Sequence, residues 1–260
     1  MDLASEPVIE FRDVIYRLTS GHEILRGLML AVKPGEILVL LGRSGSGKTT
    51  ALKLVNRLLD ISAGDIRVEG KSIVDWDAIQ LRRHIGYVIQ DIGLFPHYTI
   101  ERNIGLVPSI EKWTNQKIAA RVQELLKLVG LTNDVGARYP HQLSGGQRQR
   151  VGVARALAAD PPILLMDEPF GALDPLTRSD LQREFLSLQR KLGKTVLFVT
   201  HDLHEALLLG TRIALLDEGR LVAMSSPQEF LNSSEPLVQK YVEAFGSLIP
   251  GQGPPLRGTK

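Results

Sequence analysis

Apolar residues along the chain gather into short runs, and their spacing predicts both strands and helices. Five runs are nearly continuous and bounded by polar residues or glycine, which is typical of strands buried on both faces. They are Gly35–Gly42, His84–Gln90, Ile163–Glu168, Thr195–His201 and Arg212–Gly219. Helical segments separate several of these runs, so we expect a largely parallel α/β sheet with right-handed crossovers.

Two further segments near the N-terminus alternate between apolar and polar residues. Val8–Tyr16 and Glu23–Val32 flank a turn around Ser20–Gly21, and a shorter segment, Asp65–Gly70, follows. Alternation of this kind indicates strands with one buried face. We therefore expect a small antiparallel sheet beside the main one.

The region between about residues 91 and 160 has helical spacing, most clearly in the amphipathic stretch Thr114–Gly130. We interpret it as an inserted helical subdomain of a single unit that spans residues 1–245. Residues 246–260 are dense in glycine and proline, which predicts a disordered tail.

Composition narrows the possible functions. The 260 residues are 43% hydrophobic and 23% charged, with a net charge of +2 and no cysteine. A polycationic, nucleic-acid-binding face is not indicated, and disulfides and thiolate metal sites are excluded. The first ten residues lack the pattern of a secretory signal, and no apolar run approaches the ~20 residues that cross a bilayer. We expect any membrane role to depend on a partner.

The stretch Gly42–Thr50, GRSGSGKTT, carries the strongest chemical signal. Its glycines let backbone N–H groups turn toward phosphate oxygens, Lys48 brings a positive charge, and the Thr49 hydroxyl can ligate Mg²⁺. It follows a predicted strand and precedes a predicted helix, Thr49–Leu59. We therefore predict a nucleoside triphosphate site formed by Gly42, Arg43, Ser44, Gly45, Ser46, Gly47, Lys48, Thr49 and Thr50.

Two adjacent carboxylates end the strand Ile163–Glu168. Parallel strands present their carboxyl ends at the nucleotide crevice, so Asp167 can reach Mg²⁺ through water. Glu168 can then polarise the water that attacks the γ-phosphorus.

A second glycine-rich motif, LSGGQ at Leu143–Gln147, is followed at once by a helical run. Ser144 and the N–H groups of Gly145 and Gly146 would form another anion site at a helix N-terminus. The chain has only one set of lysine and carboxylates, so the economical hypothesis is that LSGGQ closes over a nucleotide held by a second copy.

With these motifs the chain resembles the ATP-binding subunit of an ABC transporter over nearly all of residues 8–242. The resemblance implies a P-loop NTPase (RecA-like) core with a small antiparallel β subdomain and an inserted helical subdomain. It implies that Gln90 contacts Mg²⁺ or the attacking water and that His201 contacts the γ-phosphate and orients Glu168. Gly171–Asp174 resembles the loop that crosses between subunits, so Asp174 joins Ser144, Gly145, Gly146 and Gln147 as an expected contributor to the nucleotide site.

The chain departs from the family at one position. Many relatives have an aromatic residue near the end of the first strand, where it stacks on adenine; here that position holds Leu18, and the nearest aromatic is Tyr16. Strand alternation would place both on one face. Adenine is expected to pack on Leu18, with Tyr16 either beside it or in the core.

The resemblance also implies cofactors and partners. We expect ATP and Mg²⁺, with Thr49, Gln90 and Asp167 serving the metal. Expected partners are a second ATPase subunit, forming a homodimer, membrane permease subunits and, indirectly, an extracytoplasmic solute-binding protein, with no nucleic acid. The chain would then lie on the cytoplasmic face of the inner membrane. Within Asp91–Pro108, the side chains of Leu94, Phe95 and Tyr98 either receive a permease helix or form the core of the lobe.

The resemblance is greatest to importers of quaternary-amine osmoprotectants such as glycine betaine, carnitine and choline. Segments that support this are VNRLL after the phosphate loop, RHIGYVIQDIGLFPHYTIERNIGLVP, Trp113 shortly after it, and RVGVARALAA. Two alternatives stay open, namely a lipid or drug transporter ATPase and a soluble ABC-type ATPase that acts on nucleic acid or ribosomes.

Overall fold

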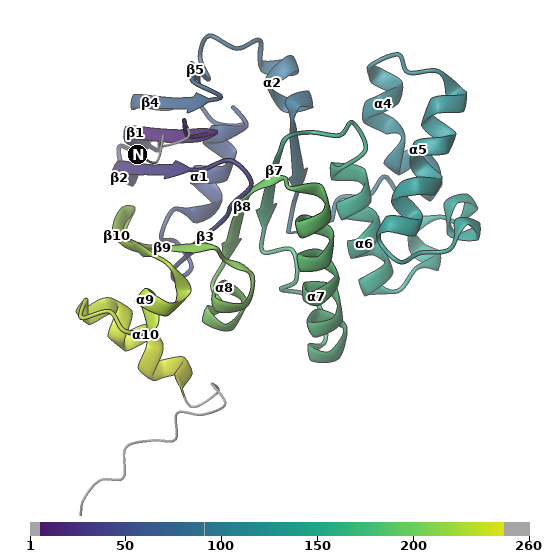
Figure 1. The fold of residues 1–260 in the computed structure, drawn as a ribbon. Coiled ribbons are helices and arrows are strands. Elements are labelled where there is room, and N and C mark those ends of the chain that lie inside the picture. The colour runs from purple at the N-terminus through teal and green to yellow at the C-terminus, as the bar shows by residue number, and fades with distance from the viewer. Residues whose placement is uncertain (1–5, 91, 247–260) are drawn as a thin grey trace, which may run out of the picture.

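The centre of the molecule is a six-stranded sheet in a computed structural model that describes residues 6–90 and 92–246. The strand order is β10-β9-β3-β8-β7-β6, and every pair is parallel except β9 with β10 (Figure 1). The strands are β3 (Ile37–Leu41), β6 (Ile85–Val88), β7 (Ile163–Asp167), β8 (Thr195–Thr200), β9 (Arg212–Asp217) and β10 (Arg220–Ser225). The predicted largely parallel α/β sheet is confirmed. The antiparallel edge strand β10 was not predicted.

A four-stranded antiparallel sheet lies beside it, with the order β2-β1-β4-β5. It comprises β1 (Ile9–Arg17), β2 (Glu23–Val32), β4 (Ala63–Val68) and β5 (Lys71–Ser72). The predicted small antiparallel sheet is therefore confirmed. Strand β5 escaped the sequence analysis because two residues are too few to show alternation.

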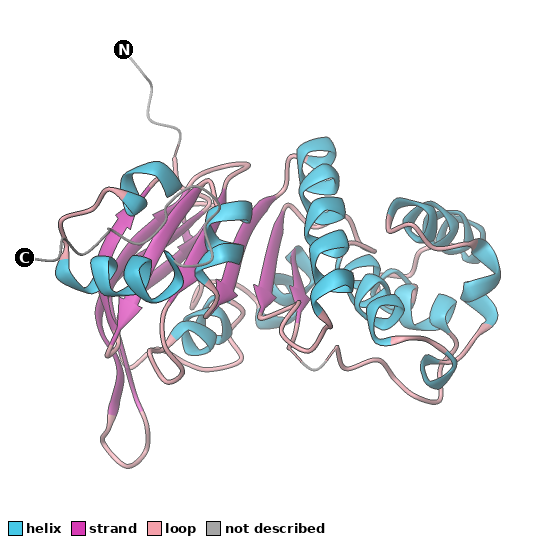
Figure 2. Ribbon diagram, turned by 90° about the horizontal axis from the view of Figure 1, so that it is seen from below, coloured by secondary structure: helices cyan, strands magenta, loops and turns pink. Residues whose placement is uncertain are grey.

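Helices cover both faces of the central sheet (Figure 2). Those outside the helical subdomain are α1 (Lys48–Val55), α2 (Ala78–His84), α7 (Pro175–Leu192), α8 (Leu203–Leu209), α9 (Pro227–Leu231) and α10 (Pro236–Gly246). Helix α1 ends four residues before the predicted Leu59, because Arg57 takes a positive φ of 47° that cannot continue a helix. Residue His84 closes α2 and does not start β6.

The helical subdomain stands at one end of the molecule (Figures 1 and 2). It contains α3 (Ile100–Ile104), α4 (Leu106–Ile110), α5 (Asn115–Leu128) and α6 (Gly145–Ala156), with short 3-10 turns at η1 (Asn133–Ala137) and η2 (Pro140–Gln142). The side chain of Thr114 caps α5 by accepting a hydrogen bond from Lys117 N. In the described part of the chain, none of the helices combines the length and the apolar character that crossing a membrane requires.

The predicted disordered tail lies outside the described residues, apart from Gly246, which is the last residue of α10.

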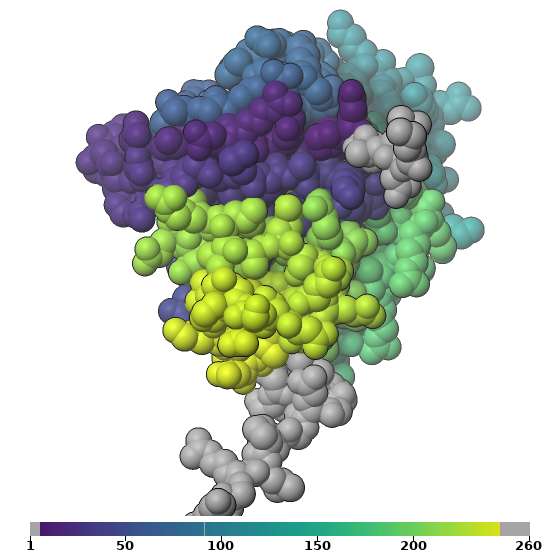
Figure 3. All heavy atoms as spheres, turned by 60° about the vertical axis from the view of Figure 1, so that its left-hand side comes forward, coloured from purple at the N-terminus to yellow at the C-terminus, as the bar shows by residue number. Residues whose placement is uncertain are grey.

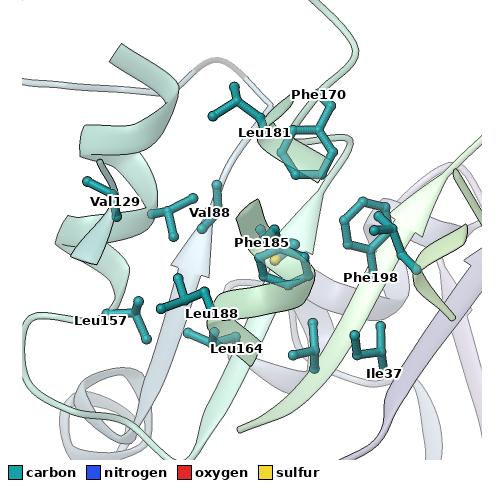
Figure 4. Close-up of a cluster of buried hydrophobic side chains, with 14 of the residues drawn as sticks. Ile37, Val88, Val129, Leu157, Leu164, Phe170, Leu181, Phe185, Leu188 and Phe198 are labelled. Carbon is teal, nitrogen blue, oxygen red and sulfur yellow. The ribbon is translucent and has the colours of Figure 1, made fainter. Parts of the chain in front are cut away.

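Alternate side chains of the central strands point to opposite faces, so the sheet divides two cores. On one face, Val39 of β3 and Phe198 of β8 pack toward α6, α7 and α8. On the other, Leu38 and Leu197 pack toward α1 and the small sheet. Figure 4 shows the first core, where Phe170, Phe185 and Phe198 lie together; the ring centroids of Phe170 and Phe198 are 5.9 Å apart.

Replacing Phe198 with alanine tests how far the aromatic cluster stabilises the fold. The side chain is fully buried, so we expect Phe198→Ala to lower the free energy of unfolding by about 3–5 kcal/mol, measured by urea denaturation. The matched control is Met29→Ala, because Met29 is 63% exposed and should change stability by less than about 0.5 kcal/mol. Equal effects of the two substitutions would contradict the packing described above.

Candidate active site

The phosphate-binding loop connects β3 to α1 and ends at Gly47, which precedes the helix. Gly47 has φ 98°, and a Cβ there would lie 2.6 Å from the Leu25 side chain, so only glycine fits. No side chain caps the start of α1. The first N–H groups of the helix therefore remain available for an anion, which the positive end of the helix dipole would also attract.

Lys48 lies buried under this loop. Its Nζ donates hydrogen bonds to the carbonyl oxygens of Gly42 and Arg43, each at 2.8 Å, and lies 3.5 Å from the hydroxyl of buried Ser46. Burial lowers the pKa of Lys48, while the carboxylates of Glu168 and Asp167 oppose that shift. A bound phosphate would supply the negative partner that the buried ammonium group requires.

Asp167, at the end of β7, faces the start of α1. The Thr49 hydroxyl donates to Asp167 Oδ1 at 2.8 Å, and the Tyr87 hydroxyl lies 3.5 Å from Oδ2. Burial raises the pKa of Asp167, and the nearby charge of Glu168 adds to the increase. A hydroxyl and a buried carboxylate are the hard oxygen ligands that Mg²⁺ prefers, so these two residues fit the expected metal. Gln90 lines the same cavity.

Glu168 follows Asp167 in a conformation that is rare for a residue other than glycine. Its φ is 43°, its N–H donates to Val199 O at 3.0 Å, and its carbonyl accepts from Gly171 N at 3.1 Å. His201 Nδ1 lies 3.0 Å from Glu168 Oε2. A carboxylate oxygen accepts, so this contact is a hydrogen bond in the tautomer whose Nδ1 carries the proton. The strained backbone thus holds a carboxylate against a histidine, which suits a general base and the group that orients it.

One cavity of about 760 Å³ is lined by most of these groups, whereas Ser46 and Asp167 are buried and are not among its lining residues. The residues that line it and that the sequence predicted are Gly42, Arg43, Ser44, Gly45, Gly47, Lys48, Thr49, Thr50, Gln90, Glu168 and His201. They come from the phosphate-binding loop, from α1 and from the segments that follow β6, β7 and β8, which all meet at one edge of the sheet. Such a site can bind a polyphosphate and activate a water molecule beside it.

The cavity has further walls that the sequence analysis missed. Ile24 comes from β2, and Lys240, Tyr241 and Ala244 come from α10. Helices α9 and α10 are the yellow segment in Figure 3, packed below the strands β9 and β10. About two hundred residues separate α10 from the phosphate-binding loop in sequence, and no local pattern marks this contact.

The two candidate adenine contacts lie elsewhere. Tyr16 packs against the core between the central sheet and the small sheet, while Leu18 is 42% exposed in the turn after β1. Strand alternation does not extend to Leu18, because β1 ends at Arg17. Neither residue lines the cavity, and contact of either with adenine stays a prediction.

The LSGGQ motif forms the start of α6, outside the cavity. The Ser144 hydroxyl accepts from Gln147 N at 3.2 Å, and the Gln147 side chain accepts from Ser144 N at 3.0 Å, which makes a capping box. A Cβ on Gly146 would lie 2.6 Å from the Thr177 side chain, so this glycine lets α6 approach α7. Gly145 lies in the same turn. Asp174 caps α7 by accepting from Thr177 N, and hydrogen bonds from the side chain and then the backbone of Thr177 lower the pKa of Asp174.

Comparison with known proteins agrees with this geometry. A sequence profile of the ABC transporter family matches residues 25–171. The choline transport ATP-binding protein of Bacillus subtilis is 51% identical over 223 residues, which cover 85% of this chain and 58% of that protein. The glycine betaine uptake system ATP-binding protein of Escherichia coli is 50% identical over 224 residues, which cover 86% of this chain and 72% of that protein.

The chain therefore spans somewhat under three fifths of the length of the Bacillus relative. Among solved structures, a dimeric ATP-binding cassette in a post-hydrolysis state, bound to ADP and Pi, superposes with a TM-score of 0.75. It is 34% identical, and the match covers 84% of this chain and 98% of that one.

Replacing Asp167 with asparagine tests the electrostatic description of the site. A raised pKa means that the folded protein binds more protons than the unfolded chain at pH values between the unfolded and folded pKa. Stability is therefore lost as pH rises through this window. Asp167→Asn removes the buried charge and keeps an acceptor for Thr49, so we expect it to raise the stability of the nucleotide-free protein by about 1 kcal/mol near pH 8.

Thermal melting without nucleotide or Mg²⁺ measures this effect, and the advantage should shrink as pH falls toward the ordinary aspartate pKa of 3.8. Asp180→Asn is the matched control, because Asp180 is 64% exposed. An Asp167→Asn protein that melts below the wild type at every pH would refute the description.

Proposed function

Because this chain belongs to the ABC transporter family, we propose that it binds and hydrolyses ATP to drive import of a small solute through separate membrane permease subunits. The observation that carries this proposal is the cavity lined by Lys48, Thr49 and the Glu168–His201 pair, with Asp167 hydrogen-bonded to Thr49 beside it. The proposed ATP-binding unit spans residues 1–245.

In the proposed reaction, the N–H groups of Gly45, Gly47 and the first turn of α1 bind the phosphates of ATP together with Lys48. Mg²⁺, held by Thr49 and Gln90 and through water by Asp167, would neutralise charge on the transferred phosphoryl group. Glu168 accepts a proton from the attacking water, and His201 holds the Glu168 carboxylate in place while contacting the γ-phosphate.

A second copy would complete the site. Ser144, Gly145, Gly146, Gln147 and Asp174 lie outside the cavity of their own chain, although their motifs resemble nucleotide-binding elements. Leu176, two residues after Asp174, is 80% exposed. The ATP-binding cassette with which this chain superposes is dimeric. We propose a head-to-tail homodimer that closes on ATP and opens after hydrolysis.

The permease would dock on the helical subdomain beside Gln90. Fully buried Asn103 fixes the loop there: its Oδ1 accepts from Phe95 N at 2.8 Å, and its Nδ2 lies 3.1 Å from Phe95 O and 3.2 Å from Tyr98 O. Phe95 is 41% exposed and packs its ring 5.3 Å from that of Tyr98. A rigid, half-exposed aromatic pair suits a protein interface.

A cavity of about 520 Å³ lies nearby in the same subdomain. Its lining includes Thr99, Gly105, Ile118 and Val122, which come from the segments between α3 and α5. We propose that a cytoplasmic helix of the permease contacts this surface. Leu94, in contrast, packs against the core, as the alternative interpretation expected.

The proposed substrates are quaternary-amine osmoprotectants. Both transport relatives described above are named for such amines, choline and glycine betaine. The chain would then act at the cytoplasmic face of the inner membrane, held there by its permease, with a solute-binding protein on the opposite side. The small net charge of +2 favours this over a role on nucleic acid.

Glu168→Gln tests the proposed chemistry. The amide cannot accept the proton of water, so we expect kcat for ATP hydrolysis to fall by about 10²–10⁴. Binding of ATP should persist and should trap the dimer, visible as an ATP-dependent shift in size-exclusion chromatography. Glu124→Gln is the matched control, since Glu124 is 60% exposed in a surface ion pair with Arg121. Hydrolysis at the normal rate by Glu168→Gln would exclude Glu168 as the base.

The same two variants test the substrate when produced in cells with the permease subunits. We expect uptake of labelled glycine betaine or choline to require ATP turnover, so Glu168→Gln should abolish it and Glu124→Gln should not. Uptake of neither amine by the wild-type transporter would reject the substrate class and leave the ATPase assignment intact.

A further inference from the structure

Glu205 is a buried carboxylate without a role in the chemistry above. It lies in the first turn of α8, four residues after His201, and its exposure is 3%. Its Oε1 accepts a hydrogen bond from Gln182 Nε2 at 2.9 Å, and its Oε2 accepts from Thr200 Oγ1 at 2.6 Å. Burial raises the pKa of Glu205. An interior carboxylate is costly, and an apolar residue would fill this position more cheaply if packing were its only task.

One of these hydrogen bonds fixes the backbone around His201. Thr200 Oγ1, which donates to Glu205, also accepts from Asp202 N at 3.0 Å. Asp202 in turn caps α8 by accepting from His204 N at 2.7 Å. The residues on both sides of His201 are therefore held, while the His201 side chain itself is 61% exposed. The direction of its ring toward Glu168 depends on this turn.

The other hydrogen bond connects the turn to α7. Gln182 is 3% exposed on the face of α7 that packs toward α8. One helical turn earlier, Arg178 Nη2 donates to the carbonyl oxygens of Gly171 at 3.1 Å and Leu173 at 3.3 Å, and its Nη1 lies 3.7 Å from Asp202 Oδ2. Arg178 thus joins the loop 171–174 to Asp202, and Gln182, one turn further along the same helix, joins α7 to Glu205.

We propose that Glu205, together with Gln182, is a positioning residue for His201. The two side chains connect the turn Thr200–Asp202 to α7. The position of the loop 171–174, which Arg178 joins to the same helix, then determines the orientation of the His201 ring toward Glu168. This inference rests on the proposed ATPase function. It gives the loop proposed to face the second subunit a physical route to the catalytic pair, through side chains that do not line the cavity.

Leucine substitutions separate positioning from packing. Glu205→Leu and Gln182→Leu each remove the hydrogen bond between Gln182 of α7 and Glu205 of α8, and the leucine side chain fills the space of the polar one. Glu205→Gln, in contrast, keeps an acceptor for Gln182. We expect kcat to fall by about ten- to a hundredfold in both leucine variants with KM for ATP changed less than about twofold, and Glu205→Gln to restore most of the rate. The matched control is Gln189→Leu, which removes bonds from the same helix to Gly35 O and Lys194 O.

A double-mutant cycle with His201→Ala shows through which residue Glu205 acts. If it acts through His201, Glu205→Leu should cost no further activity once His201 is absent. A purely structural loss would instead multiply with the loss from His201→Ala. The same cycle can be made with Gln182→Leu in place of Glu205→Leu. If the Glu205→Leu protein does not fold, the Gln182→Leu cycle still tests the inference.

The NMR signals of the His201 ring, recorded on nucleotide-free protein, provide a measurement that does not depend on ATP hydrolysis. The chain has six histidines, and the spectrum of His201→Ala identifies the signals in question. We expect both leucine variants to shift or broaden them and Gln189→Leu to leave them unchanged. Unchanged His201 signals, or fully multiplicative losses in the cycle, would overturn the inference. A wild-type protein without ATPase activity would instead reject the proposed function, while the ring signals would still test the positioning.

Discussion

The structure depends on one constraint: the backbone N–H groups at the start of α1 have no side-chain cap and must find an anion. The phosphate-binding loop and Lys48 lie against these groups. Gly47 lets the loop approach Leu25 of the small sheet. Lys48 donates hydrogen bonds to carbonyl groups of the loop, and a bound phosphate would accept hydrogen bonds from it instead. Burial raises the pKa of Asp167, so its charged form is disfavoured at this position. A charged ligand that binds this site would add to the stability of the folded protein.

The central sheet brings the reacting groups to the start of α1. Parallel strands end at the same edge, so the residues after β6, β7 and β8 meet the phosphate-binding loop although long segments separate them in sequence. The helical subdomain enters the chain between β6 and β7, and so follows Gln90 in sequence. The packing of Gly146 on Thr177 and the hydrogen bonds of Arg178 and Gln182 then connect the LSGGQ segment, the loop 171–174 and Glu205 to α7.

Local signals allowed much of this to be predicted from the sequence. The phosphate-binding loop, the buried strands and the helix caps depend on near neighbours, and the structure confirms the predicted fold. The elements that escaped prediction have physical reasons: β5 is two residues long, and β10 is a half-buried edge strand with weak alternation. The walls formed by Lys240 and Tyr241 of α10, and the bond between Gln182 and Glu205, arise from tertiary packing, which spacing along the chain does not encode. The strand end before Leu18 follows from the bulged pairing of β1 with β2.

We propose that each ATP lies between Lys48 of one subunit and Ser144 of the other, and a mixture of two inactive variants tests this shared site. Lys48→Ala and Ser144→Arg should each abolish hydrolysis alone. In their mixture, half of the randomly formed dimers contain one complete site, so we predict recovery of up to about a quarter of the wild-type rate. A mixture as inactive as its components, or full activity of Ser144→Arg alone, would contradict the shared site.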